Sequence, residues 1–202
     1  MGQEAKCTLT FRRARVEGTA LLETDALTFR GGDVRLSVPY RDIASVSASD
    51  DALRVEFGGG VAVFAVGPVA ARWADRIRNP PTRLDKLGIR PGAVVILVDI
   101  KDEAFAAEIA ARGARVSTRL AGEADVIVLG AERRDRLGKL VPIQRHLKRD
   151  GAIWVIRPKG VDAITERDVM QAGWAAGLVD VKVARFSETH TAEKFVVPVR
   201  RR

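Results

Sequence analysis

The sequence predicts two domains: an antiparallel β-barrel with one terminal helix over residues 1–79, then an α/β domain over residues 84–202. Two observations support this division. Apolar and polar residues alternate through most of residues 6–66, as half-buried antiparallel strands require. From residue 87 onward, apolar runs alternate with helical patterns, which is typical of a mostly parallel sheet, and the last two strands form its antiparallel C-terminal edge.

Seven short strands are expected in the first segment, separated by turns rich in Gly, Asp and Ser. They span residues 8–11, 18–23, 26–30, 34–38, 43–47, 53–57 and 61–66. One amphipathic helix follows Pro68, because Val69, Trp73 and Ile77 recur on one face at four-residue spacing. Residues 79–81, Asn-Pro-Pro, end this helix and begin a linker.

Seven strands followed by one helix resemble a pleckstrin-homology-like barrel, of which the lipid-responsive GRAM domain is one relative. The resemblance rests on the order of the elements and on Trp73. It implies a phosphoinositide site in the first hairpin, where Arg12, Arg13 and Arg15 lie. However, residues 1–82 carry 11 Lys and Arg against 10 Asp and Glu, which gives little attraction to an acidic membrane. Recognition of a protein is therefore the favoured role for this domain.

The second segment predicts strands at residues 93–98, 115–117, 125–129, 152–156, 179–186 and 194–199. Helices are expected over residues 103–112, 133–148 and 165–176. Gly113 is a helix C-terminal signal, and Thr165 with Asp168 resembles a capping box. Trp154 and Trp174, like Trp73, lie on apolar faces and are expected in the core.

The loop that follows the strand at residues 93–98 reads Asp-Ile-Lys-Asp-Glu and contains no glycine. In nucleotide-binding α/β folds, glycines at this point let the backbone approach the ligand and expose N–H groups at the helix start. Here three of five side chains are acidic and repel phosphate. We therefore predict no cofactor. No catalytic motif is found either, so the sequence favours a protein that is not an enzyme.

Several short sequence stretches of the second segment are similar to the C-terminal half of a Rossmann-like methyltransferase domain. They lie at residues 124–129 (ADVIVL), 146–155 (HLKRDGAIWV) and 176–181 (AGLVDV). Residues 86–92 (KLGIRPG), 154–159 (WVIRPK) and 177–183 (GLVDVKV) resemble an uncharacterised bacterial family with a small Rossmann-like domain. The resemblance covers residues 84–202 and implies a Rossmann-like fold. It brings no catalytic residues that can be transferred to this chain.

Four residues form the candidate ligand site. Asp99 and Asp102 follow a strand at its carboxyl end, where they would bind a hydroxylated or cationic ligand. Alternatively, Asp102 stabilises the start of the next helix through its dipole. Arg157 and Lys159 follow another strand and would bind an anion if their loop is exposed on the same rim. An ordinary loop explains them equally well.

Composition excludes several classes of protein. The longest apolar run is far shorter than the roughly 20 residues of a membrane-spanning helix, and no signal peptide is visible. Cys7 is the sole cysteine and only two histidines are present, so no disulfide or metal site is predicted. A cytoplasmic location is expected.

We therefore expect a bacterial module that binds a protein partner or a small ligand on a degenerate Rossmann-like scaffold. One alternative is a divergent enzyme that uses S-adenosylmethionine (SAM) or a nucleotide. A second alternative is nucleic-acid binding, because residues 83–202 carry 23 Lys and Arg against 16 Asp and Glu. Three of these cations form the C-terminal tail.

Overall fold

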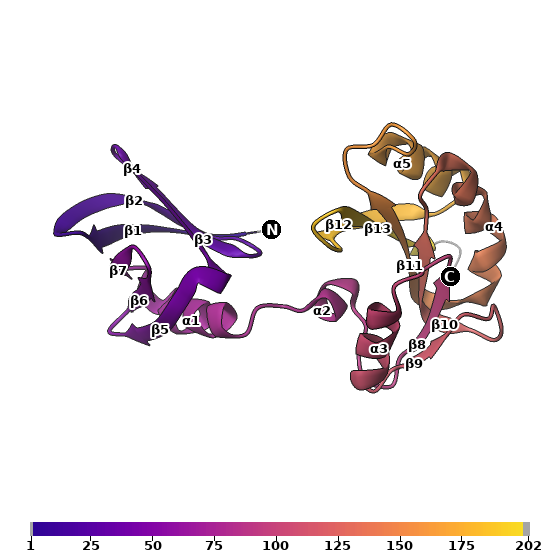
Figure 1. Cartoon of the computed structure of the whole chain (residues 1–202), viewed down its shortest axis with the longest axis horizontal. Helices are drawn as coiled ribbons and strands as arrows, with labels where there is room; N and C mark the ends of the chain where they lie inside the picture. Colours follow the sequence, from indigo (N-terminus) through magenta and orange to yellow (C-terminus); the bar gives the residue numbers. More distant parts are fainter. Residues whose placement is uncertain (1, 200–202) are drawn as a thin grey trace. The chain divides into compact units, whose positions relative to one another are not determined.

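In the computed structural model the chain separates into two compact units, Met1–Pro81 and Thr82–Arg202, and the structure describes residues 2–199. Figure 1 shows the elements of both units. The basic tail at residues 200–202 lies outside the described residues. Within residues 2–199, no helix combines the length and apolar character needed to cross a membrane.

Seven strands and one α-helix make up the first unit between residues 2 and 81. The strands are β1 (Gln3–Phe11), β2 (Ala14–Leu22), β3 (Ala26–Gly31), β4 (Val34–Pro39), β5 (Ile43–Ser49), β6 (Ala52–Phe57) and β7 (Gly60–Phe64). A 3-10 turn, Tyr40–Asp42, joins β4 to β5, and another, Gly67–Val69, leads into α1 (Ala70–Arg78).

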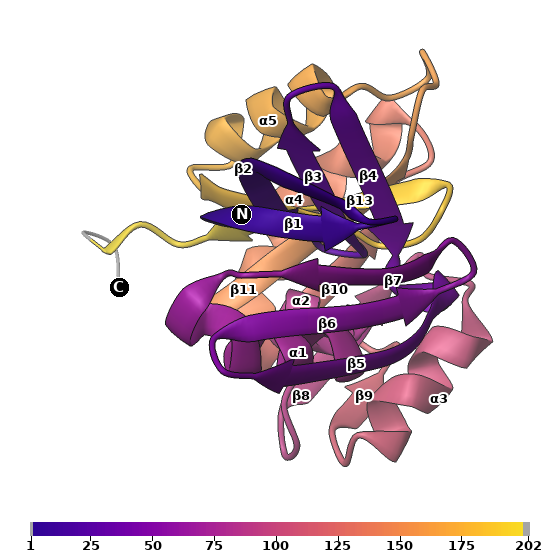
Figure 2. The same ribbon diagram turned by 90° about the vertical axis from the view of Figure 1, so that its left-hand side faces the viewer.

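All seven strands pair antiparallel in the order β4-β3-β2-β1-β7-β6-β5. Figure 2 shows β4 and β5 on opposite margins of this sheet. The predicted pleckstrin-like barrel is therefore wrong: the described strands form an open, half-barrel sheet with two free edges. Alternation predicts which residues face a core, but it does not decide whether the first and last strands of the row meet.

The sheet nevertheless curls around one core. Phe29 on β3 and Phe64 on β7 pack edge to face with ring centroids 6.2 Å apart, although two strands separate them in the sheet. The curl requires close contact at Gly18, where a Cβ atom would lie 2.3 Å from the Arg30 carbonyl oxygen. Helix α1 packs on β5 and β6, and its Trp73 is fully buried as predicted.

The second unit contains six strands and four α-helices in its described part. The strands are β8 (Val94–Val98), β9 (Arg115–Ser117), β10 (Ala124–Gly130), β11 (Leu147–Pro158), β12 (Val179–Arg185) and β13 (His190–Val196). The helices are α2 (Arg83–Leu87), α3 (Glu103–Ala111), α4 (Leu140–Ile143) and α5 (Glu166–Ala175).

The sheet order is β12-β13-β11-β10-β8-β9. Strands β9, β8, β10 and β11 are parallel, whereas β13 is antiparallel to both of its neighbours. The sheet is therefore mixed, and its helices are few and short. The predicted Rossmann-like α/β class is corrected to a mixed six-stranded sheet with sparse helical cover.

The helix predicted over residues 133–148 accounts for much of this difference. The structure has a 3-10 helix at Arg134–Lys139, a single α-helical turn in α4 and a second 3-10 turn at Gln144–His146, and β11 begins at Leu147. Gly138 and Pro142 lie inside the segment and weaken a regular helix there, since proline removes a backbone donor.

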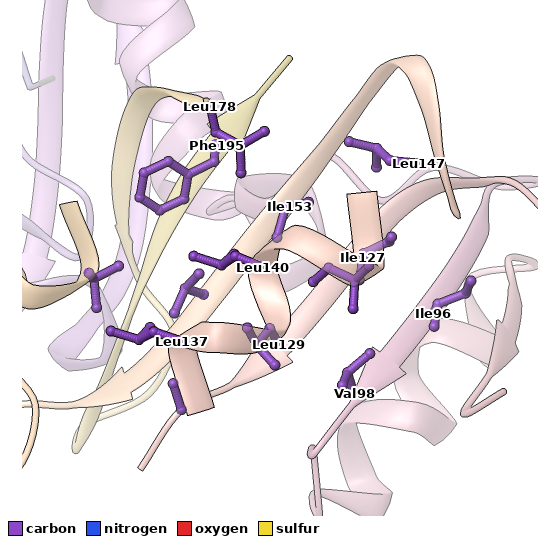
Figure 3. Packing of buried hydrophobic residues seen from close by; sticks show 14 of the residues in the cluster. Ile96, Val98, Ile127, Leu129, Leu137, Leu140, Leu147, Ile153, Leu178 and Phe195 are labelled. Atoms are coloured by element: carbon purple, nitrogen blue, oxygen red, sulfur yellow. The ribbon is translucent and has the colours of Figure 1, made fainter. Parts of the chain in front are cut away.

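Each face of the second sheet carries its own core. Figure 3 shows one of them, in which Phe195, Leu140 and Ile153 pack with residues of β8 and β10. The other core contains Trp154 and Phe105 with residues of α2. Trp154 is buried as predicted, but Trp174 is 58% exposed, so its predicted core position is wrong.

Candidate functional site

A pocket of about 400 Å³ lies at the carboxyl ends of β8, β10 and β11. It is lined by residues 99–102 after β8, by Gly130 and Glu132 at the end of β10, by Ile156 of β11, and by Phe186, Ser187 and His190 around the β12–β13 turn. Strand β8 lies between β9 and β10, so the strand order reverses here. Ligands of open α/β sheets bind at such reversal points.

Asp99 lines this pocket, and its backbone has an unusual conformation. Its φ of 54° is in the left-handed region, which non-glycine residues seldom adopt. The turn packs against Gly130, where an added Cβ atom would lie 2.5 Å from the Asp99 carbonyl oxygen. The Asp99 carboxylate is paired with Lys139 Nζ at 2.5 Å and Arg136 at 3.6 Å.

Asp102 also lines the pocket, but the fold already uses its carboxylate. It is the N-cap of α3 and accepts a hydrogen bond from the Phe105 backbone N–H at 2.9 Å. Arg83 is paired with Asp102 at 2.9 Å. The helix-capping role that sequence left as an alternative is thus present in the structure.

Arg83 was not identified from the sequence, although it supports one wall of the pocket. Its guanidinium carbon lies 4.5 Å from the ring centroid of Phe105 and 4.8 Å from that of Phe186. A second ion pair joins Arg83 to Glu108 at 2.8 Å. Cation–π contacts of this kind orient the Phe186 ring where it lines the pocket.

Arg157 does not lie in an exposed loop, and this part of the prediction is wrong. Strand β11 continues through Pro158 because Arg157 pairs with Thr191 and Pro158 with His190 on β13. Side chains alternate along a strand, so Arg157 points away from the face on which Ile156 lines the pocket. Arg157 is 8% exposed and is not brought together with Asp99 on one rim.

Lys159 supports the pocket without lining it. Its Nζ donates hydrogen bonds to the carbonyl oxygens of Ser187 at 2.9 Å and Glu188 at 3.2 Å. Its backbone N–H donates to the Thr189 carbonyl oxygen at 2.9 Å. Lys159 therefore holds the β12–β13 turn that contributes Ser187 and His190 to the pocket.

His190 and Glu132 form a polar pair at the pocket. His190 Nε2 lies 3.5 Å from Glu132 Oε1, and the Glu132 side chain is 75% exposed. Sequence spacing did not reveal the pair, because 57 residues separate them and only the β11–β13 pairing brings them together. A glutamate two residues after a buried strand was the signal that was available.

Arg157 instead forms a buried ion pair with Glu193, whose side chain is fully inaccessible. Arg157 Nε donates to Glu193 Oε1 at 2.9 Å, and Glu166 lies 3.8 Å from the same guanidinium. Glu193 Oε2 is buried without a hydrogen-bond partner. Burial raises the pKa of Glu193 to about 7, Arg157 opposes this rise, and Glu166 adds to it.

This raised pKa predicts that stability depends on pH between about 5 and 8. The folded state holds the Glu193 proton more tightly than the unfolded chain, in which its pKa is near 4.5. The contribution of the protonated Glu193 side chain to the free energy of unfolding is thus fully present below pH 4.5 and is lost as pH rises through about 7. Urea denaturation at pH 5, 6, 7 and 8 should show a falling free energy of unfolding, and Glu193→Gln should flatten this dependence. An equally steep decline in the variant would contradict the assignment.

Comparison with known proteins finds partial likenesses to solved structures. No family model matches the chain, and no curated protein sequence matches it. A SAM-dependent methyltransferase from Aquifex aeolicus matches with 12% identity and a TM-score of 0.46, over 55% of this chain and 86% of that one. A TehB-like SAM-dependent methyltransferase from Corynebacterium glutamicum matches with 14% identity and a TM-score of 0.44, over 63% and 95%. Both likenesses are partial, with TM-scores below 0.5.

The residues of the pocket do not fit SAM in the arrangement that the sequence resemblance to Rossmann-like methyltransferase domains implies. No glycine stands in the turn after β8, and the Asp99 carbonyl oxygen fills the space beside Gly130. The Asp102 side chain already binds the Phe105 N–H at the start of α3. Strand β9 is followed by Thr118 and Arg119 and thus lacks an acid at its end. We derive no reaction through SAM.

Proposed function

We propose that the second unit is a non-catalytic module that binds a small cationic or hydroxylated ligand in the pocket at the carboxyl ends of β8 and β10. The observation that carries this proposal is the pocket's place at the reversal of strand order, combined with its acidic lining. Its volume of about 400 Å³ suits a small molecule rather than a folded partner.

The charges of the lining select the class of ligand. The lining contains three acidic residues, Asp99, Asp102 and Glu132. Its basic residues are Lys101 and His190. Asp99 and Asp102 are held by cations, yet their carboxylates keep lone pairs that accept hydrogen bonds from hydroxyl groups. Glu132 has His190 beside it at 3.5 Å and remains mostly exposed, so it supplies the negative charge for a cationic group. A phosphate placed beside Glu132 would be repelled by its carboxylate.

Calorimetric titration of the full chain with three probes tests this proposal. We expect spermidine or adenosine to bind with at most millimolar dissociation constants, and ATP not to bind. Glu132→Lys should weaken spermidine binding at least tenfold, because it reverses the charge at the rim. Glu123→Lys is the matched control, since Glu123 is exposed outside the pocket lining and should bind like the wild type.

Three results would overturn the proposal: no heat with either spermidine or adenosine, preferential binding of ATP, or equal effects of the two lysine variants. SAM is included as a fourth ligand. Binding of SAM at a lower concentration than adenosine would favour the alternative, an enzyme that uses an adenosyl group in a different pose.

A further inference from the structure

The two edges of the first sheet differ in how they are protected. Strand β4 carries Arg35, which bonds to the carbonyl oxygens of Gly32 and Val34, and it ends at Pro39. Strand β5, with the sequence IASVSAS, contains neither a charged residue nor a proline. Proteins commonly protect edge strands with such residues because an unprotected edge pairs with another chain. The β5 edge is therefore open to strand addition.

Most side chains on β5 are small. Five of its seven residues are Ala or Ser. A register shift between Ile43 and Ser45 disturbs the start of the strand, but pairing with β6 is regular from Ser45 to Ser49. The regular part is long enough to form several hydrogen bonds with an added strand.

A groove of about 680 Å³ runs along this edge, between β5 and the C-terminal end of α1. Ile43 and Val46 from β5 and Ile77 from α1 contribute its apolar surface. Tyr40 is held at one end by a hydrogen bond from its hydroxyl to the Glu23 carbonyl oxygen at 2.8 Å. The groove thus has apolar pockets beside a free strand edge, as peptide recognition by strand addition requires.

The charged residues that line the groove are both arginines, Arg41 and Arg78. Arg41 is 81% exposed at its side chain and has Asp42 at 3.7 Å. Arg78 Nε donates a long hydrogen bond of 3.4 Å to the Val46 carbonyl oxygen. This carbonyl group therefore faces α1 rather than β6. An N–H group of an added peptide would replace Arg78 Nε, which is a weak donor at this distance. Acidic side chains on the peptide would then meet the two guanidinium groups.

We propose that the first unit binds an extended acidic peptide of a protein partner along β5, in the groove beside α1. The peptide adds an antiparallel or parallel strand to the sheet, its backbone bonds to β5, its apolar side chains enter the groove, and its carboxylates contact Arg41 and Arg78. This site is separate from the ligand pocket of the second unit, and the two proposals stand or fall independently.

Fluorescence anisotropy with the full chain and a labelled peptide, acetyl-Val-Glu-Val-Glu-Val-Glu-Val-amide, tests the proposal. We expect saturable binding that is lost when alternate peptide nitrogens are methylated, because methylation removes the donors of the strand. Arg78→Glu should weaken binding at least tenfold. Arg72→Glu is the matched control, since Arg72 is exposed on the same helix and does not line the groove.

A charge exchange sharpens this test. The double variant Arg41→Glu/Arg78→Glu should lose the acidic peptide and gain the corresponding Val-Lys peptide, with circular dichroism confirming that it folds. Absence of binding by the acidic peptide, equal binding of its methylated form, or equal losses in the Arg72 and Arg78 variants would overturn the proposal. Binding to phosphatidylserine vesicles that needs Arg41 and Arg78, without peptide binding, would also overturn it and indicate a membrane surface.

Discussion

Replacing Glu193 by alanine is expected to lower the free energy of unfolding at pH 7.5 by about 3–5 kcal/mol, because it leaves the buried Arg157 guanidinium without its hydrogen-bond acceptor. Arg157 is 8% exposed, and Glu193 Oε1 accepts its hydrogen bond at 2.9 Å. Glu166 is 3.8 Å away and mostly exposed, so it compensates weakly. Urea denaturation followed by circular dichroism measures the loss.

Two further variants separate this explanation from simple loss of a side chain. Glu188→Ala removes an exposed glutamate from the adjoining turn and should change the free energy of unfolding by less than about 0.5 kcal/mol. Arg157→Met with Glu193→Leu replaces both charges by apolar groups and should recover most of the stability. If the free energy of unfolding of this double variant did not exceed that of Glu193→Ala, the explanation by an unpaired buried guanidinium would be contradicted.

Trp73→Ala is expected to cost about 3–5 kcal/mol, because it opens a large cavity in the core of the first unit. Trp73 is fully buried among residues of β1–β3, β6 and β7. Its indole Nε1 is also buried and has no hydrogen-bond partner. Trp73→Phe therefore removes an unsatisfied donor along with part of the ring, and it should cost less than about 1.5 kcal/mol.

Trp174→Ala provides the matched control for this prediction. Trp174 is 58% exposed and donates one hydrogen bond, to Asp180 at 2.9 Å. Its removal should cost at most about 1 kcal/mol. Denaturation of all three variants is best followed by circular dichroism, since the substitutions alter the tryptophan fluorescence. Similar losses for Trp73→Ala and Trp73→Phe would show that the indole nitrogen has a partner in solution.

Local patterns predicted most of the individual elements. Alternation located all seven strands of the first unit, and the spacing of Val69, Trp73 and Ile77 located α1. Whether β4 meets β5 is not encoded in any local pattern, and the predicted barrel was accordingly wrong. The sequence also could not show that Gly138 and Pro142 would divide one long helix into short turns.

Only the residues of the candidate site that come soon after β8 in the sequence were predictable. Asp99 and Asp102 line the pocket because they come directly after β8. Arg157 was misplaced because pairing with β13, more than thirty residues later, extends β11 past the expected end. Glu132 and His190 were missed for the same reason: a hairpin at the end of the chain carries His190 to the end of β10.

The close packing of Asp99 on Gly130 ties the identities of two distant positions together. The backbone oxygen of Asp99 occupies the space that a side chain at position 130 would need. A related sequence with alanine or a larger residue at the position of Gly130 must therefore turn differently after its first parallel strand. The absence of glycine from that turn is tolerated because the glycine stands on the neighbouring strand instead.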